Sequence, residues 1–167
     1  MNSSSTRRTF AMRFGSILSA LGIAAVGFTS GATAQSSDAN SIRKLNGEGK
    51  PGSEKDVIMP AVIHNGVIYV SGIGAHDSRD KKEWTIESHT TNVMDKLKKI
   101  VEVAGGTMDT VVQTNVFLTN IDHWDGMHKV FGTYFPHGGP ARTTVAVAAL
   151  PGNSLVEINC IAVVAQK

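Results

Sequence analysis

The sequence predicts an α+β fold, in which one sheet carries two helices on one of its faces. Two short apolar strand patterns come first after residue 56, two segments with helical spacing of apolar residues flank a further strand, and two strands follow. The predicted order is therefore β-β-α-β-α-β-β. A sheet of this kind must bury one face, which places both helices on that face. The length of 167 residues suits one such domain.

Local signals define the first four elements. Asn65-Gly66 separates two apolar runs within residues 57–70 and predicts a hairpin, because both residues tolerate positive φ. Residues 85–104 are predicted to be a helix that ends before Gly105-Gly106. The helix carries one apolar stripe: Val93, Leu97, Ile100, Val101 and Ala104. Residues 111–118 alternate and are rich in β-branched side chains, which predicts a strand.

The remaining elements follow the same reasoning. A second helix is predicted over residues 122–135, with Asp122 as the N-cap. Its expected inward residues are Trp124, Met127, Phe131 and Tyr134. Pro151-Gly152 fits a type II turn, which would join strands 142–150 and 154–164 into an antiparallel hairpin. Several strands are apolar on both faces, and two helices cannot cover both. We therefore expect the second face to contact other copies of the chain.

Residues 1–34 have the pattern of a signal peptide. Arg7-Arg8 and Arg13 precede an apolar run over residues 14–28, which is shorter than the ~20 residues that span a bilayer. Ala32-Thr33-Ala34 predicts cleavage before Gln35. The arginine pair is typical of the twin-arginine route, but it also occurs in Sec signals. An amphipathic or buried N-terminal helix is the alternative interpretation. The pattern favours a periplasmic or secreted protein.

The rest of the chain is predicted to be nearly neutral. Residues 35–55 are polar, are broken by Pro51-Gly52 and predict a linker or irregular arm before a domain over residues 56–167. Without the three arginines of the signal, 13 of the 16 basic residues remain against 14 acidic ones, a formal net charge of −1. Nucleic-acid sites need clustered Lys and Arg. We therefore expect no nucleic-acid partner, and no membrane contact after signal removal.

Cysteine and histidine patterns give no sign of a metal site. Cys160 is the single cysteine and lies in an alternating apolar segment, which predicts a buried small hydrophobe. Among the histidines, only His76 is followed by an acidic residue four positions later, Asp80, and the sequence offers no third ligand nearby. We expect neither a metal nor a cofactor.

The last predicted hairpin carries two charged residues among apolar neighbours. If it turns at Pro151-Gly152, Arg142, Thr144 and Glu157 share one side of the sheet in either of two registers. Burying either charge without a partner is costly. The pair is either a structural ion pair or a small anion site. In the second case Arg142 would bind a carboxylate through two hydrogen bonds, and Glu157 would act on the reacting end.

The same residues resemble the signature of a known family. The run Pro140-Ala141-Arg142-Thr143-Thr144-Val145, followed by Val156-Glu157-Ile158, resembles the Rid/YjgF signature of reactive intermediate deaminases. The segment ending in Ser71-Gly72 resembles the family's apolar strand, and the match runs from about Ile42 to Ala165. The resemblance implies a chorismate-mutase-like homotrimer with a site in each cleft between subunits.

The resemblance also implies an activity that needs no cofactor. This is the hydrolysis of enamines and imines with small carboxylates, such as 2-aminoacrylate, to a 2-keto acid and ammonia, as in a 2-iminobutanoate/2-iminopropanoate deaminase. Arg142 would hold the substrate carboxylate and Glu157 would position or activate water. The backbone near Ser71-Gly72 would contact the substrate from a neighbouring subunit.

Three substrate-site positions depart from the deaminase pattern. Ile58 stands where the family has Tyr, Thr144 where it has Cys, and His128 where it has Asn. His128 is either a local acid or base or a surface or interface histidine. The alternative function is a non-catalytic trimer that binds a small molecule or a protein in the same clefts. The ribonuclease activity ascribed to some family members is disfavoured by the neutral charge.

Overall fold

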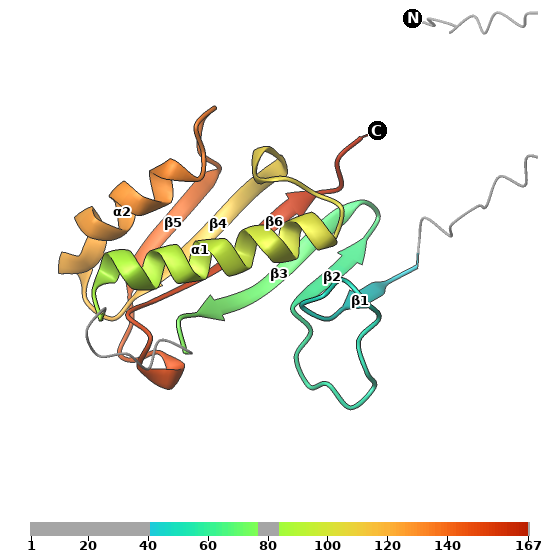
Figure 1. Cartoon of the computed structure of the whole chain (residues 1–167), viewed down its shortest axis with the longest axis horizontal. Coiled ribbons are helices and arrows are strands. Elements are labelled where there is room, and N and C mark those ends of the chain that lie inside the picture. The colour runs from blue at the N-terminus through green and yellow to red at the C-terminus, as the bar shows by residue number, and fades with distance from the viewer. Residues whose placement is uncertain (1–40, 77–83, 167) are drawn as a thin grey trace, which may run out of the picture. The chain divides into compact units, whose positions relative to one another are not determined.

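Six strands form one mixed sheet in the order β1-β2-β3-β6-β4-β5 (Figure 1), as seen in a computed structural model that describes residues 41–76 and 84–166. All neighbouring strands are antiparallel except β4 and β5, which are parallel. The strands are β1 (Arg43–Leu45), β2 (Ala61–His64), β3 (Val67–Gly74), β4 (Val111–Leu118), β5 (Ala141–Ala146) and β6 (Val156–Val163).

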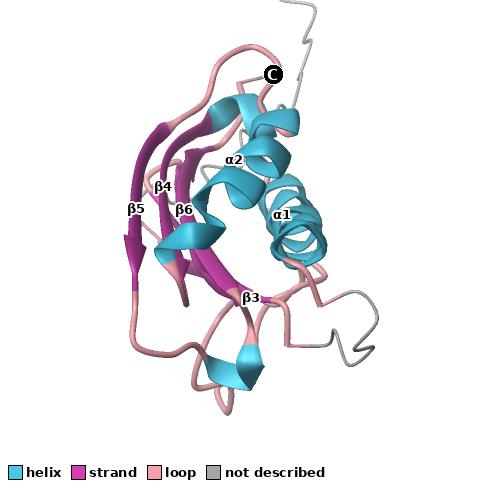
Figure 2. Ribbon diagram, turned by 90° about the vertical axis from the view of Figure 1, so that its left-hand side faces the viewer, coloured by secondary structure: helices cyan, strands magenta, loops and turns pink. Residues whose placement is uncertain are grey.

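Two helices, α1 (Ile86–Val103) and α2 (Trp124–Thr133), lie on one face of the sheet, and the other face carries no helix (Figure 2). This arrangement confirms the predicted α+β class. None of the helices in the described part of the chain is long and apolar enough to cross a membrane.

The first helix follows its local signals closely. Thr85 is the N-cap, and its hydroxyl accepts from the backbone N–H of Ser88 at 3.2 Å, while the Ser88 hydroxyl accepts from the N–H of Thr85 at 3.2 Å. Gly105 follows the helix at φ +98°, a left-handed conformation that favours glycine. The hairpin between β2 and β3 is likewise confirmed, since Asn65 and Gly66 have φ values of 50° and 75°.

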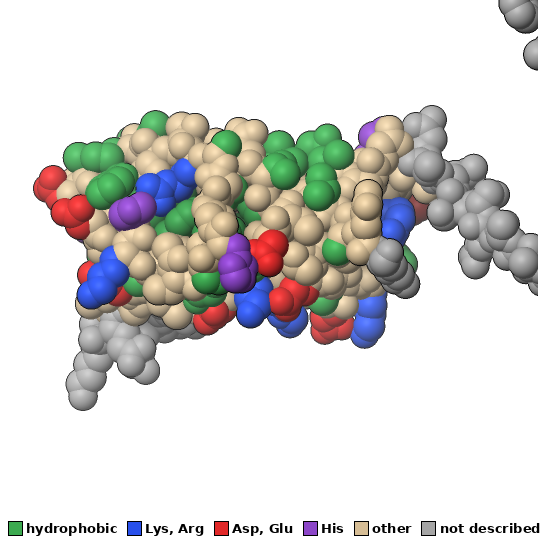
Figure 3. All heavy atoms as spheres, turned by 90° about the horizontal axis from the view of Figure 1, so that it is seen from above, with side chains coloured by type: hydrophobic (Ala, Val, Ile, Leu, Met, Phe, Trp, Pro, Cys, Tyr) green, Lys and Arg blue, Asp and Glu red, His purple; other side chains and the backbone are tan. Residues whose placement is uncertain are grey.

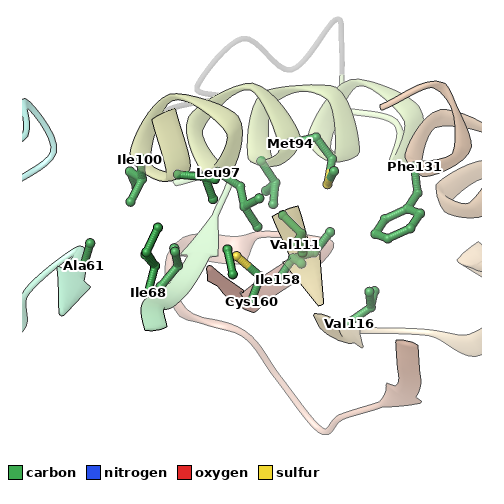
Figure 4. Close-up of a cluster of buried hydrophobic side chains, with 14 of the residues drawn as sticks. Ala61, Ile68, Met94, Leu97, Ile100, Val111, Val116, Phe131, Ile158 and Cys160 are labelled. Atoms are coloured by element: carbon green, nitrogen blue, oxygen red, sulfur yellow. The ribbon is translucent and has the colours of Figure 1, made fainter. Parts of the chain in front are cut away.

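The core lies between this helical layer and the sheet. Met94, Leu97 and Ile100 point from α1 towards Ile68 and Ile158 on the sheet (Figure 4). Each fully buried side chain of this size contributes roughly 1.5–3 kcal/mol to folding. Cys160 is 3% exposed in the same layer, as predicted, and burial raises the pKa of its thiol to about 12.

The predicted hairpin between the last two strands is wrong. β6 lies between β3 and β4 in the centre of the sheet, whereas β5 forms an edge and pairs with β4 in parallel. Pro151–Asn153 form a short 3-10 turn, with Gly152 at φ +62°, inside a connection that carries the chain past β4. The physical reason is burial: alternate residues of β6 are fully buried, whereas β5 is largely exposed and suits an edge.

Other boundaries differ more locally. β1 lies inside the segment 35–55 predicted as an irregular arm, and residues 57–60 precede β2 without joining it. A 3-10 turn at Ile121–His123 leads into α2 and is capped by the Asn120 side chain, so Asp122 is not the N-cap. Met127 and Phe131 are buried as predicted, but Trp124 is 38% exposed.

The face without helices has an apolar surface. Tyr69, Val145 and Val163 lie on it and are 47%, 41% and 39% exposed. The side-chain amide of Asn115 donates to Oδ1 of Asn159 at 2.9 Å across β4 and β6 on this same face. Large exposed apolar side chains on one sheet face are typical of an interaction surface. The predicted contact with other copies of the chain stays a prediction.

Candidate functional site

Arg142 lies at the start of β5, on the face that the helices cover. Its strand partner on β4 is Thr114, which is fully buried beneath the helical layer. The guanidinium carbon lies 4.8 Å from the ring centroid of Phe131 and 5.9 Å from that of Trp124. Both distances are typical of cation–π contacts. Two aromatic rings of α2 therefore hold the Arg142 guanidinium against the helix.

His128 completes this contact. Arg142 Nη2 lies 3.1 Å from His128 Nδ1. An arginine nitrogen can only donate, so Nδ1 is the acceptor and Nε2 carries the proton of the neutral ring. The imidazole also stacks on Trp124, with ring centroids 4.6 Å apart and planes 19° apart. Positions 124 and 128 are one helical turn apart, so the two rings meet on the same face of α2.

A pocket of about 360 Å³ opens beside this contact. Figure 3 shows a purple histidine side chain next to a blue one, with green apolar side chains close by. The lining residues are His128, Phe131, Gly132, Phe135, Gly139, Pro140 and Arg142. A somewhat larger hollow of about 400 Å³ lies beside Lys98 and Tyr134, but none of the predicted site residues lines it.

The charge of Arg142 is not neutralised within the described part of the chain. No carboxylate there forms an ion pair with it. The side chain is half-buried, and this burial lowers the pKa of Arg142 from its ordinary value, although a guanidinium stays charged in proteins. A desolvated cation without an anion favours binding of one.

Two buried hydroxyl groups lie near Arg142 on the helix face of β4 and β5. Thr144 is two residues along β5 and pairs with Val116, and Thr114 is the partner of Arg142. Neither Oγ1 atom has a hydrogen-bond partner among the described residues. Leaving a buried hydroxyl unpaired costs about 1–3 kcal/mol. These hydroxyls add unused hydrogen-bonding capacity on the same face as Arg142.

Glu157 belongs to a different cluster, on the opposite face of the sheet. It pairs with Phe117 on one side and Gly74 on the other. Its carboxylate lies over Gly72, where an added Cβ would overlap Glu157 Oε1. Ser71 fixes this part of β3, because its Oγ donates to the carbonyl of Met59 at 2.6 Å. Ser71, Gly72 and Glu157 therefore form one group.

The prediction that Arg142, Thr144 and Glu157 share a face is wrong. Glu157 pairs with Phe117 of β4, and Arg142 pairs with Thr114 of the same strand. The two residues are therefore offset by three positions along β4. With strands about 4.8 Å apart and residues about 3.3 Å apart, the Cα atoms of Arg142 and Glu157 are about 14 Å apart. An offset of three residues also puts their side chains on opposite faces. One chain thus carries two separate groups of predicted site residues, which we call half-sites.

The predicted residues divide between these half-sites. Arg142, Thr144 and His128 lie on the helix face, and Ser71, Gly72 and Glu157 lie on the other. Ile58 is 74% exposed in the loop before β2, next to Met59. Trp124 and Phe131, whose rings contact Arg142, were not predicted as site residues. Trp124, His128 and Phe131 are spaced four and three residues apart, which places them on one helix face and could have indicated a shared contact. The aromatic residues of this set were assigned to the core instead. No group of three or more His, Cys, Asp or Glu side chains in residues 41–76 and 84–166 is placed to hold a metal ion.

Comparison with known proteins adds the family context. The model of the family described as Endoribonuclease L-PSP matches residues 56–164. The mitochondrial protein mmf2 of Schizosaccharomyces pombe is 36% identical over 105 residues, which cover 61% of this chain and 83% of that protein.

Solved structures are similar over the same region. A protein of unknown function from Yersinia pestis, YyfA of the conserved Rid protein family, is 34% identical with a TM-score of 0.64, covering 74% of this chain and 100% of that one. The YjgF gene product of E. coli is 25% identical with a TM-score of 0.63, covering 72% of this chain and 98% of that one.

The relative from S. pombe contradicts the predicted periplasmic or secreted location, because it is named as a mitochondrial protein. The predicted signal peptide falls in residues 1–34, which lie outside the described residues. An N-terminal segment rich in Arg and Ser and free of acidic residues is also typical of mitochondrial transit peptides. The pattern of residues 1–34 therefore does not distinguish a secretory signal peptide from a mitochondrial transit peptide.

Proposed function

Because the chain belongs to the Endoribonuclease L-PSP family, which includes the Rid and YjgF proteins, we propose that it hydrolyses imines and enamines that carry a carboxylate. The products are a 2-keto acid and ammonia. The observation that carries this proposal is Arg142, a half-buried cation that has no carboxylate partner in the described part of the chain and borders a pocket of about 360 Å³.

The chemistry needs orientation and one group that moves protons. The Arg142 guanidinium binds the substrate carboxylate through two hydrogen bonds. An enamine first takes a proton on carbon and becomes the imine. Water then attacks the carbon of the protonated C=N bond, and Glu157 removes a proton from that water. Transfer of this proton to nitrogen makes ammonia the leaving group. As the C–N bond breaks, the hydroxyl that came from water loses its proton to Glu157 and becomes the carbonyl.

If Arg142 and Glu157 act on one substrate, as we propose, the two half-sites need a second copy of the chain. Arg142 and Glu157 leave opposite faces of one sheet, so one small substrate cannot touch both within one chain. The face that carries Glu157 has no helix over it and exposes Tyr69 and Val145. We therefore place each site between neighbouring copies of a homotrimer, where Arg142 of one copy faces Glu157 of the next.

The activity is tested with imines that an amino-acid oxidase generates in place, by following ammonia release. Arg142→Ala should lower kcat/KM about 10²–10⁴-fold, because two hydrogen bonds to a charged group are lost at about 1.5–3 kcal/mol each. Arg142→Lys keeps the charge but cannot form the two parallel hydrogen bonds, so its kcat/KM should lie between those of the wild type and Arg142→Ala. Lys44→Ala, an exposed charge on β1, is the control. If the wild type releases ammonia no faster than buffer from any amino acid, the protein is not an imine deaminase.

The shared site has its own test. Arg142→Ala and Glu157→Gln each have strongly reduced activity alone under this mechanism. When both variants are expressed together, mixed trimers contain some sites with Arg142 from one copy and Glu157 from another. Activity should therefore return on mixing. If mixed trimers form and are no more active than either parent, Arg142 and Glu157 do not form a site shared between copies of the chain.

A further inference from the structure

The pocket beside Arg142 has a wall that a three-carbon substrate would not need. Phe131, Phe135 and Pro140 supply apolar lining, and Arg142 is the one charged side chain among the lining residues. His128 is the other polar side chain, and its Nδ1 already accepts from Arg142. A pocket with one fixed cation and an apolar wall is complementary to an anion that carries an apolar group.

The volume of the pocket points the same way. A water molecule in the liquid takes up about 30 Å³, and we use this value for each non-hydrogen atom of a substrate. The imine of alanine has roughly six such atoms and would occupy about 180 Å³. The roughly twelve atoms of the imine of phenylalanine occupy about 360 Å³ on the same basis. The pocket measures about 360 Å³. A three-carbon substrate would therefore fill only part of the pocket.

Two glycines leave this space open. Gly132 lies on α2 and Gly139 lies in the segment before β5, and both line the pocket. A Cβ added at either position would meet no atom within 4 Å. Neither has a positive φ, so backbone conformation does not require glycine at either position. The absence of side chains there gives the pocket room next to the Arg142 guanidinium.

We propose that this pocket receives the side chain of the substrate, so that the protein selects carboxylates with bulky apolar side chains, aromatic ones above all, over three-carbon carboxylates. The inference rests on the proposed function, since it gives the substrate class of the same site. The carboxylate binds Arg142 and the side chain extends from the neighbouring carbon along Phe131 and Phe135. The reacting C=N group then faces the cleft towards Glu157 of the next copy.

The binding test uses two stable keto acids, so it does not depend on turnover. Calorimetric titration of the full protein should give a Kd for phenylpyruvate at least tenfold lower than for pyruvate. Gly132→Leu adds a side chain at a position that lines the pocket, without a clash at Cβ, and should raise the Kd for phenylpyruvate at least tenfold, with less than threefold change for pyruvate. Lys129→Leu, an exposed position on the same helix that does not line the pocket, is the matched control.

Three results separate this inference from the proposed function. Equal affinity for both keto acids, or equal loss of both in Gly132→Leu, overturns the side-chain pocket even when imine hydrolysis is observed. Selective binding of phenylpyruvate with no ammonia release from any imine supports the pocket and refutes the deaminase. Selective binding that survives Gly132→Leu places the apolar group elsewhere and overturns the inference. Gly132→Ala, which adds one methyl group in open space, checks that folding tolerates a side chain at this position.

Discussion

His128 should hold the Arg142 guanidinium in the direction that a carboxylate needs. Its Nδ1 accepts from Arg142 Nη2 at 3.1 Å, and its ring stacks on Trp124 at 4.6 Å. His128→Phe keeps a ring of similar shape for the stack but removes the acceptor. His128→Asn removes the ring but keeps an oxygen near the position of Nδ1. The two variants therefore separate the hydrogen bond from the packing.

The size of the effect follows from this one bond. A hydrogen bond to a charged group contributes about 1.5–3 kcal/mol when it is shielded from water. His128 is exposed and Arg142 is half-buried, so we take a value at or just below the lower end of this range, about 1–1.5 kcal/mol. Since 1.4 kcal/mol is tenfold in an equilibrium constant, His128→Phe should raise the Kd for phenylpyruvate about five- to tenfold.

Calorimetry and steady-state kinetics measure this prediction together. His128→Phe should raise Kd and KM about five- to tenfold and change kcat less than about twofold, because Arg142 binds the carboxylate in both ground and transition states. The Kd of His128→Asn for phenylpyruvate should stay within about threefold of the wild-type value, below the fivefold increase expected for loss of the bond. Thermal unfolding of both variants checks that neither change acts through stability. Wild-type affinity in His128→Phe, or an equal loss in both variants, would refute the positioning role.

Two further predictions concern other parts of the domain. His89 is fully buried, its Nδ1 accepts from the N–H of Leu155 at 3.0 Å, and burial, followed by the charge of His123, lowers its pKa below 6.5. As the pH falls, His89 therefore takes up a proton in the unfolded chain before it does so in the folded protein. The free energy of unfolding should then fall as the pH drops below 6.5. Urea unfolding at pH 7.5 and 5.5 should show this loss in the wild type and a smaller one in His89→Asn, whose amide oxygen can still accept; equal losses would contradict it. Gly72→Ala should displace the Glu157 carboxylate and lower kcat at least tenfold with little change in phenylpyruvate affinity, whereas unchanged kcat would count against Glu157 as the proton-moving group.

Local patterns in the sequence determined the elements of this fold. Asn65-Gly66 forms the expected tight turn, and residues 111–118 are a strand with the predicted bounds. Thr85 and the apolar stripe of 85–104 define α1 to within one residue at each end. Each of these features depends on hydrogen bonds and side-chain spacing within a few residues, so the sequence itself contains the required information. The charged residues Arg142 and Glu157 were also identified from their sequence context.

Only the tertiary structure decided which strands pair and therefore which residues meet. Adjacent strands joined by Pro151-Gly152 favour a hairpin locally, yet β6 buries more apolar surface in the centre of the sheet than it would at an edge. Because β6 pairs with β4 and not with β5, Glu157 is offset from Arg142 by three positions along β4 and lies on the opposite face of the sheet. This pairing places Glu157 over Gly72, and it leaves Arg142 to the aromatic face of α2. Side-chain direction alternates with every residue, so the pairing of one strand determines the composition of both half-sites.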